Sequence, residues 1–323
     1  MNFQGLAKIE KHEWYIDLAF RNATKKAKDI KSQMRRTPYT IKRAEVAKIS
    51  EIRRTLRRHL DIILKSFPSI DGMNEFYQEL VRATLEYAQL KKSLGAIRWA
   101  QQKIEHFSDV YSNKVKRCGD FKKMTHYSRE YYGRISSVMR QVKKPLQYLE
   151  TSRKVMRDFP SVKEKLFTIA IAGFPNVGKT TLLAKLTTSK PEIAAYPFTT
   201  RKLNIGYATI KNHKVQFIDT PGTLNRFEKM NSIEKQAHLA IKYCADLIIF
   251  VFDISDQTYD EEKQGKLLNK LKKSGKDTLI YLSKTDLAGK EKTGLSKAAI
   301  SKKYPFIKAV ATDPKDLKHR IAL

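Results

Sequence analysis

The chain has 323 residues, and 64 lysines and arginines against 33 aspartates and glutamates give it a formal net charge of +31. A charge this large exceeds what solubility needs and indicates a polyanionic partner. The longest apolar run, Leu247 to Phe252, is far too short to cross a bilayer, so we exclude a membrane-spanning protein and expect no membrane partner. Nucleic acid is then the expected partner.

Residues 10–158 have a helical pattern. Apolar residues recur at three- and four-residue spacing, and the only prolines are Pro38, Pro68 and Pro145. This pattern predicts four to six helices in an all-α helical-bundle domain, with turns near Pro38 and Pro68. The length suits two domains, which we place at residues 1–160 and 161–323.

One predicted helix of the first domain carries an apolar stripe and a cluster of arginines. The stripe is Ile49, Ile52, Leu56, Leu60 and Ile63, and the cluster is Arg53, Arg54, Arg57 and Arg58. Charge clusters are usually solvated helix faces. Here Glu51 and Asp61 are the only acids in the segment, so the arginines would repel one another unless an anion lay against them. We therefore favour contact between these four residues and an RNA backbone.

Residues 161–323 alternate between strand and helix patterns, which predicts a three-layer α/β domain with a mostly parallel sheet. The expected strands are 166–172, 203–210, 215–219, 247–253, 278–283 and 306–311. The expected helices are 181–186, 233–245, 261–273, 295–303 and a short one after Pro314.

The stretch Gly173-Phe174-Pro175-Asn176-Val177-Gly178-Lys179-Thr180 satisfies the phosphate-loop pattern G-x-x-x-x-G-K-[ST] between the first strand and its helix. Gly173 and Gly178 allow the tight turn, Lys179 supplies a cation to the β- and γ-phosphates, and Thr180 ligates Mg²⁺. The predicted nucleotide contacts in this loop are Gly173, Asn176, Val177, Gly178, Lys179, Thr180 and Thr181.

Two further stretches fit a nucleoside triphosphatase. Asp219-Thr220-Pro221-Gly222 ends a predicted strand, where Asp219 can meet Mg²⁺ and Gly222 can approach the γ-phosphate. Between it and the phosphate loop lies Tyr196-Pro197-Phe198-Thr199-Thr200-Arg201, in which Thr200, with Thr199 as the alternative, would close over the metal. Lys179, Thr200 and Gly222 are the predicted catalytic residues.

Ser283-Lys284-Thr285-Asp286 follows another apolar strand and resembles the N-K-x-D motif that recognises guanine. Asp286 can accept hydrogen bonds from N1–H and the exocyclic amine, which adenine does not offer, so we expect GTP to be preferred over ATP. Lys284 would lie along the base, and Ser283 in place of asparagine predicts weaker affinity. Ala311 would offer its backbone N–H to the guanine oxygen.

Together these motifs resemble the Obg-related translation-factor GTPases, and within them the nucleolar GTP-binding protein (Nog) family in its short archaeal form. The N-terminal half, including Phe67-Pro68 and Phe76-Tyr77, shares the resemblance. It implies a cytoplasmic, Mg²⁺-dependent GTPase that cycles between GTP and GDP. The resemblance further implies that the helical domain binds large-subunit ribosomal RNA or its precursor, alongside other assembly factors and without DNA.

Hydrolysis is expected to be slow. Thr223-Leu224 follows the Asp-Thr-Pro-Gly stretch, where many signalling GTPases place a water-orienting glutamine. Positioning or charge would then come from RNA, protein or a monovalent cation, and Asn176 stands where K⁺-stimulated relatives coordinate K⁺. Two other functions fit the sequence: a GTP-gated RNA-binding scaffold with little hydrolysis, and a GTPase partner of an RNA-modification enzyme.

Overall fold

The computed structural model describes residues 3–34, 37–163, 165–187, 192–195, 202–220, 232–255 and 260–321. Spatial proximity divides the chain into two compact units. The helical unit comprises residues 4–69 and 85–157, and the sheet unit comprises residues 70–84 and 158–323 together with Phe3. The join at residue 158 lies beside the domain boundary expected after residue 160, whereas residues 70–84 group with the sheet.

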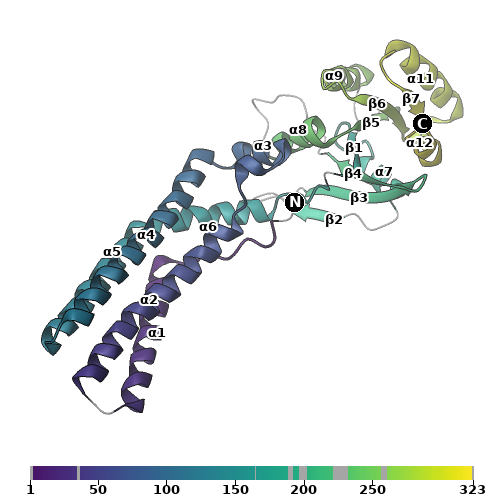
Figure 1. The fold of residues 1–323 in the computed structure, drawn as a ribbon. Helices are drawn as coiled ribbons and strands as arrows, with labels where there is room; N and C mark the ends of the chain where they lie inside the picture. The colour runs from purple at the N-terminus through teal and green to yellow at the C-terminus, as the bar shows by residue number, and fades with distance from the viewer. Residues whose placement is uncertain are drawn as a thin grey trace. The chain divides into compact units, whose positions relative to one another are not determined.

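The helical unit is a bundle of long helices (Figure 1). Its members are α1 (His12–Gln33), α2 (Pro38–Ser66), α4 (Tyr87–Arg117), α5 (Phe121–Gln141) and α6 (Lys143–Arg157). Helix α2 packs against both α1 and α4, and α4 also packs against α5 and α6. The apolar stripe predicted on α2 is fully buried, and it meets a core that includes Tyr131, whose hydroxyl lies 2.9 Å from that of Ser108.

The starts of two bundle helices have local causes. Thr37 precedes α2 and accepts a hydrogen bond from the backbone N–H of Thr40 at 3.2 Å, while Pro38 fills the first helical position. Asp120 precedes α5 and accepts from the N–H of Lys122 at 2.7 Å. Helix α2 begins at Pro38 and ends at Ser66, so the helix boundaries expected near Pro38 and Pro68 are confirmed.

Residues 70–84 contain the short helix η1 (Ile70–Gly72) and α3 (Glu75–Thr84), and they are bound into the sheet unit. The buried Tyr77 hydroxyl donates to the carbonyl of Pro160 at 2.9 Å and accepts from the N–H of Val162 at 3.0 Å. Helix α3 also packs on α8 (Ser232–Cys244). Helix α3 thus ends at Thr84, and α4 begins separately at Tyr87.

The sheet confirms the predicted α/β class. Its strands are β1 (Phe167–Ala172), β2 (Glu192–Ala195), β3 (Lys202–Ile210), β4 (His213–Asp219), β5 (Leu247–Asp253), β6 (Asp277–Ser283) and β7 (Ala309–Ala311). Their spatial order is β2-β3-β4-β1-β5-β6-β7, and the five strands from β4 to β7 run parallel while β2 and β3 are antiparallel to their neighbours. The buried strands are nearly continuous apolar runs, as a sheet covered on both faces requires.

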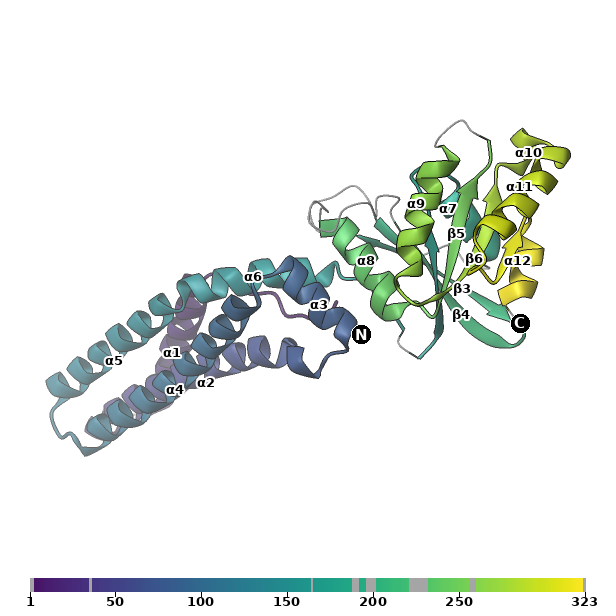
Figure 2. The same ribbon diagram turned by 90° about the horizontal axis from the view of Figure 1, so that it is seen from above.

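Helices cover both faces of this sheet (Figure 2). They are α7 (Lys179–Leu186), α8, α9 (Glu261–Lys272), α10 (Thr285–Ala288), α11 (Lys290–Lys303) and α12 (Pro314–Ile321). Strand β2 and helix α10 were not predicted from the sequence, and the elements that were predicted differ mainly at the C-terminal end. Helix α11 begins five residues before the expected Leu295 because Gly294 does not interrupt it, and β7 begins at Ala309 because residues 304–307 form a turn closed by the Ile307 N–H and the Tyr304 carbonyl. Within the described residues no helix is both long and apolar enough to cross a membrane.

Candidate nucleotide-binding site

The predicted phosphate loop connects β1 to α7 at the carboxyl edge of the parallel strands. Gly173 has φ +149°, and a Cβ there would lie 2.7 Å from the carbonyl oxygen of Val251, so a side chain does not fit. Gly178 immediately precedes α7 in a left-handed conformation, with φ +95°. The loop therefore brings its backbone to the start of α7, where unpaired N–H groups and the helix dipole favour phosphate.

Lys179 is buried at the base of this loop. Its ammonium group donates to the carbonyl oxygen of Phe174 at 2.6 Å, which draws the side chain back across the loop. Burial lowers the pKa of Lys179 to about 8, against the opposing attraction of Asp219. A phosphate beside this ammonium group would favour its charged form.

Asp219 ends β4 next to the loop. Its Oδ2 accepts hydrogen bonds from the Thr180 hydroxyl at 2.7 Å and from the Asn204 amide at 3.1 Å. Its Oδ1 is buried and has no hydrogen-bond partner among the described residues. Burial raises the pKa of Asp219, while the bonds from Thr180 and Asn204 and the charge of Lys179 lower it.

The geometry around Asp219 fits a hard divalent cation. A carboxylate oxygen with no partner among the described residues lies in the same cluster as a threonine hydroxyl, and both are oxygen ligands of the kind that Mg²⁺ takes. No group of three histidine, cysteine or acidic side chains that could hold a metal is found in the part of the chain that is described. The arrangement suits Mg²⁺, which is usually held by one or two protein oxygens together with substrate phosphates.

The predicted guanine-recognition residues lie along the same edge. Ser283 ends β6, and Ala311 ends β7 in register with Tyr281 of β6. Asp286 is exposed in α10, the short helix that follows Lys284. The sheet order thus brings the Ser-Lys-Thr-Asp stretch beside the phosphate loop, since a Cβ at position 178 would lie 3.9 Å from that of Ser283.

Ser283 does not contact the phosphate loop through its hydroxyl. The hydroxyl donates instead to the carbonyl of Phe252 on β5, at 3.2 Å. Lys284 likewise has a partner within the protein, because its ammonium group lies 2.7 Å from Oδ2 of the buried Asp253. These contacts hold both residues at the ends of adjacent strands.

The remaining residues named in the sequence analysis differ in whether the structure describes them. Thr199, Thr200 and Gly222 fall outside the described residues, as do Thr223 and Leu224. Asn176 and Thr181 are exposed and Val177 is buried, and Asn176 adopts a left-handed backbone conformation with φ +61°. The site that the structure assembles therefore contains the phosphate loop, Asp219 and the residues of the Ser-Lys-Thr-Asp stretch.

Two family models match the chain. NOG1 N-terminal helical domain matches residues 3–163, and a domain described as 50S ribosome-binding GTPase matches residues 168–284. Protein MJ1408 of Methanocaldococcus jannaschii, described as uncharacterized, is 32% identical over 283 residues, covering 85% of this chain and 79% of MJ1408. The chain belongs to the nucleolar GTP-binding protein (Nog) family.

Eukaryotic Nog relatives are longer. Nucleolar GTP-binding protein 1 of Saccharomyces cerevisiae is 33% identical over 229 residues, which cover 70% of this chain and 35% of the yeast protein. This chain thus spans about a third of the length of that relative. Among solved structures, the cytosolic domain of the T. maritima FeoB iron transporter in its apo form matches 49% of this chain and 63% of its own, with 30% identity and a TM-score of 0.41.

Sequence reasoning missed three residues that position the site of this Nog protein. Asp253 holds Lys284, and Gln264 fixes Asp253 by accepting from its N–H at 2.8 Å and donating to its carbonyl at 2.9 Å. Asn204 lies opposite Asp219 in the antiparallel pair of β3 and β4 and binds its carboxylate. The available signal for Asp253 was that this aspartate ends the otherwise apolar strand β5.

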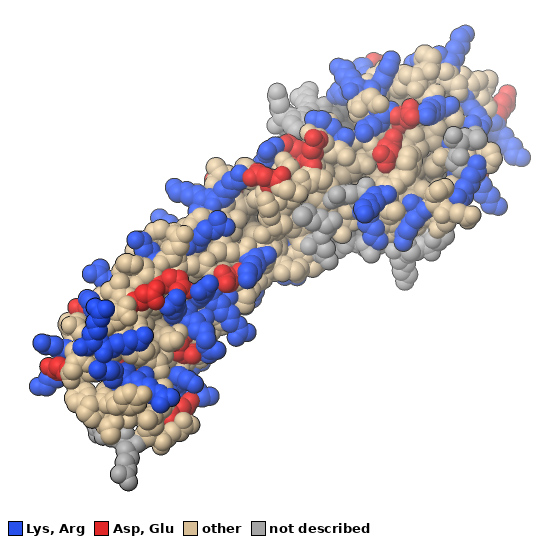
Figure 3. Space-filling model, viewed as in Figure 1, with Lys and Arg blue, Asp and Glu red and all other residues tan. Residues whose placement is uncertain are grey.

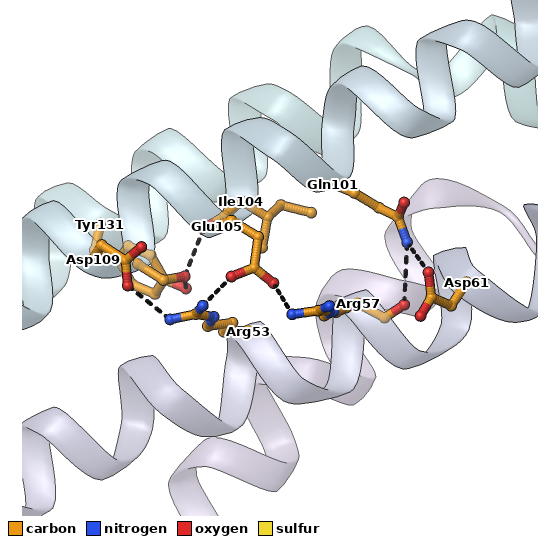
Figure 4. Close-up of polar contacts among 9 residues, drawn as sticks. Arg53, Arg57, Asp61, Gln101, Ile104, Glu105, Asp109 and Tyr131 are labelled. Carbon is orange, nitrogen blue, oxygen red and sulfur yellow. Dashed lines mark hydrogen bonds and ion pairs between the residues drawn. The ribbon is translucent and has the colours of Figure 1, made fainter.

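The arginine cluster of the helical unit requires a correction. Arg53 forms ion pairs with Glu105 and with Asp109, the latter at 2.7 Å, and Arg57 pairs with Glu105 at 3.0 Å (Figure 4). Both acids belong to α4, so the premise that no acid compensates these arginines was wrong. The acids are distant in sequence and close in the fold because α2 packs along α4.

The other two arginines differ from this pair. Arg54 binds Glu51 of its own helix through two hydrogen bonds, of 2.6 and 3.1 Å, and its side chain is 75% exposed. Arg58 has no ion pair with any residue that the structure describes. It lines a surface hollow of about 420 Å³ with Arg54, Arg57, Asp61, Ile62 and Lys65. Arg58 is therefore the member of the cluster best placed for an external anion.

Proposed function

We propose that this Nog protein binds GTP and GDP with Mg²⁺ at the carboxyl edge of the sheet, hydrolyses GTP slowly, and acts as a switch in maturation of the large ribosomal subunit. One observation carries the nucleotide part of this proposal: Lys179 and Thr180, at the end of the phosphate loop, form a cluster with Asp219. The ribosomal part is supported by the two matching family models and by the net charge of +31.

The residues of the chain have distinct tasks in this proposal. Thr180 and Asp219 hold Mg²⁺, which neutralises phosphate charge when bound. Lys179 contacts the β- and γ-phosphates. Thr200, with Thr199 as the alternative, and Gly222 respond to the γ-phosphate.

At the other end of the site, Asp286 selects guanine and Ala311 supports that selection through its backbone N–H. Lys284 lies along the base, in a position that its ion pair with Asp253 supports. Ser283 does not replace the asparagine amide, because its short hydroxyl already binds Phe252. We therefore expect guanine specificity with weaker affinity than an asparagine would give.

The helical unit is the proposed contact for ribosomal RNA. Lysine and arginine side chains are spread over the face shown in Figure 3, with fewer acidic side chains among them. Because Arg53 and Arg57 are paired with α4, we assign the phosphate contact in this cluster chiefly to Arg58, with Arg54 beside it. We place this activity in the cytoplasm, with other assembly factors and without DNA.

Helix α3 offers a path between the nucleotide and the N-terminal half of the chain. It is encoded between helices of the helical unit, yet it packs on α8, the helix that follows the Asp-Thr-Pro-Gly stretch. The Tyr77 hydroxyl joins the same segment to Pro160 and Val162, just before β1. We propose that a change at α8 on hydrolysis is transmitted through α3.

Phosphate release tests this proposal. We expect slow multiple-turnover release from GTP by the chain alone and faster release with large-subunit precursor particles, because no described residue supplies an obvious general base. K⁺ should stimulate release more than Na⁺ if Asn176 coordinates it. The Lys179→Ala variant is the matched control for contaminating activity. Absence of turnover with particles present would instead favour a GTP-gated scaffold.

A further inference from the structure

A second basic surface lies at the amino edge of the sheet, at the opposite end of β1 from the phosphate loop. Strand β1 has 6 residues, which at about 3.3 Å per residue places its two ends roughly 17 Å apart. At the amino end a hollow of about 790 Å³ is lined by the start of β1, the β3–β4 hairpin and the end of α12. Figures 1 and 2 both show the hairpin turn beside α12. We call this hollow the amino-edge groove.

The described residues that line the amino-edge groove are cationic or apolar, and none of them is an acid. They are Lys165, Leu166, Phe167, Ile210, Lys211, His213, Lys214, Val215 and Ile321. Within the described residues, neither Lys165 nor Lys214 forms an ion pair with an acid. By contrast, the lysines of the hollow beside α9 include Lys263 and Lys266, which pair with Asp260 and Glu262. Described acids therefore compensate less of the charge in the amino-edge groove than in the hollow beside α9.

An exposed aromatic ring lies among these lysines. Phe167 begins a central strand, yet it is 46% exposed, whereas the next five residues of β1 are buried. Leaving a phenylalanine half exposed gives up part of the burial free energy available to it. An aromatic face between cationic side chains is the arrangement on which single-stranded nucleic acids stack.

The hairpin turn adds a second unusual feature. Lys211 and Asn212 both have positive φ, +44° and +65°, between the paired residues Ile210 and His213. Such two-residue turns favour asparagine followed by glycine, and a lysine in this conformation is strained. The turn nevertheless presents a lysine at the rim of the groove.

We propose that the amino-edge groove binds single-stranded RNA, with Lys165, Lys211 and Lys214 at the phosphates and Phe167 stacked on a base. Charge complementarity selects a polyanion, and the exposed ring selects unpaired bases over a duplex, whose bases are already stacked. The groove gives the sheet unit its own RNA contact, separate from Arg58 in the helical unit. Only the identity of the bound RNA rests on the proposed ribosomal function.

Photo-crosslinking of the full wild-type chain tests the assignment directly. A 12-nucleotide RNA containing 4-thiouridine is crosslinked, and the attached peptides are identified by mass spectrometry. We expect crosslinks within residues 163–167 and 210–215, in addition to any in the helical unit. Crosslinks confined to residues 4–157 would overturn the proposal.

Binding by variants gives a quantitative test. With oligouridine as probe, Lys165→Gln combined with Lys214→Gln should lower the slope of log affinity against log salt by about 1.4, or 0.7 for each lost contact to a single strand. Phe167→Leu keeps an apolar side chain but removes the stacking face, so it should weaken binding roughly fivefold or more with an unchanged salt slope. Wild-type affinity in both variants would contradict the proposal.

The matched control removes the same charge elsewhere in the sheet unit. Lys297→Gln combined with Lys302→Gln changes two lysines of α11 that do not line the groove, and it should leave the salt slope close to that of the wild type. A slope reduced equally by both double variants would mean that only overall charge matters. RNA binding that is unchanged in Lys165→Gln/Lys214→Gln, with loss of binding to phosphatidylserine vesicles, would assign the groove to a lipid surface. Both results would overturn the proposal.

RNA binding in the amino-edge groove and the proposed ribosomal role can be tested separately. Each variant is first checked for unchanged GTP affinity and melting temperature, which shows that the sheet unit is folded. Groove crosslinks to RNA in a protein that ignores ribosomal particles would retain the groove and reject the ribosomal role. Particle-stimulated hydrolysis without groove crosslinks would retain the ribosomal role and reject RNA binding in the groove.

Discussion

Lys179 of the phosphate loop and the arginine cluster of α2 both carry positive charge, but the protein uses them differently. Lys179 is buried beside the Phe174 carbonyl, and Oδ1 of the nearby Asp219 has no hydrogen-bond partner among the described residues. The ammonium group of Lys179 can therefore still bind a phosphate. Arg53 and Arg57 are already neutralised by Glu105 and Asp109. A local cluster of like charge thus indicates a ligand only where the fold does not supply the counter-charge.

Among the variants of the two regions, Lys179→Ala is expected to have the largest effect. Loss of the charge-assisted contacts to two phosphates should weaken GTP binding by about a hundredfold or more, measured with a fluorescent GTP analogue. The melting temperature should not fall, because burial already lowers the pKa of this lysine to about 8 and so penalises its charged form in the folded protein. Retained GTP affinity would reject the phosphate-loop assignment.

Asp286→Asn should change specificity rather than stability. The exposed carboxylate is expected to recognise the donors of guanine, so the amide should weaken GTP binding roughly 10- to 100-fold and favour xanthine nucleotides. Competition between GTP and XTP measures this change in base specificity. Asp277→Asn, at the opposite edge of the sheet, is the matched control and should leave the GTP preference unaltered. Unchanged discrimination in Asp286→Asn would remove this residue from the base site.

Arg58→Gln should separate binding from stability within the cluster itself. Because Arg58 has no ion pair with a described residue, we expect an unchanged melting temperature and weaker RNA binding. The log–log salt slope should fall by roughly 0.9 for a duplex contact, or 0.7 for a single strand. An RNA affinity equal to that of the wild type would remove Arg58 from the interface.

Arg53→Gln is the counterpart, with the opposite expectation. It removes ion pairs to Glu105 and Asp109, so the free energy of unfolding should fall by about 0.5–1 kcal/mol, as for partly exposed pairs. Urea unfolding measures the loss, which a Glu105→Gln variant should reproduce. RNA binding reduced as strongly as in Arg58→Gln, with stability unaltered, would restore the original interpretation of the cluster.

The smallest effect is expected from pH. Burial would raise the pKa of Glu150, but hydrogen bonds from Arg153 and the Ile9 N–H outweigh it and leave that pKa below its ordinary value of 4.5. A carboxylate with a lowered pKa stabilises the folded state above pH 4.5, and this contribution is lost as pH falls through the folded pKa. Glu150→Gln should therefore flatten the dependence of unfolding free energy on pH below 4.5. An unchanged acid limb would show that Glu150 does not contribute to it.

Contiguous features of this molecule could be predicted from its sequence. The phosphate loop, the strand that precedes it and the helix that follows are set by neighbouring residues, so Gly173 and Lys179 were placed correctly. The burial of Leu56 and Leu60 followed from helical spacing alone. Such signals need no knowledge of which distant segment packs nearby.

Features that depend on distant pairing could not be predicted. The acids that neutralise Arg53 come from α4, and Asp253 reaches Lys284 only because β5 and β6 are neighbours in the sheet. The grouping of α3 with the sheet unit rests on the Tyr77 hydroxyl and on packing against α8. In each case the deciding contact joins segments whose proximity no local pattern specifies.

Co-sedimentation with large ribosomal subunits and their precursors tests the central claim most directly. The full chain is incubated with a non-hydrolysable GTP analogue, GDP or no nucleotide, across a salt series and beside small subunits. We predict binding that favours the large subunit or its precursor and that differs between the GTP analogue and GDP. Salt-sensitive binding to any RNA, indifferent to nucleotide, would contradict the claim and leave the charge of +31 without a specific ribosomal role.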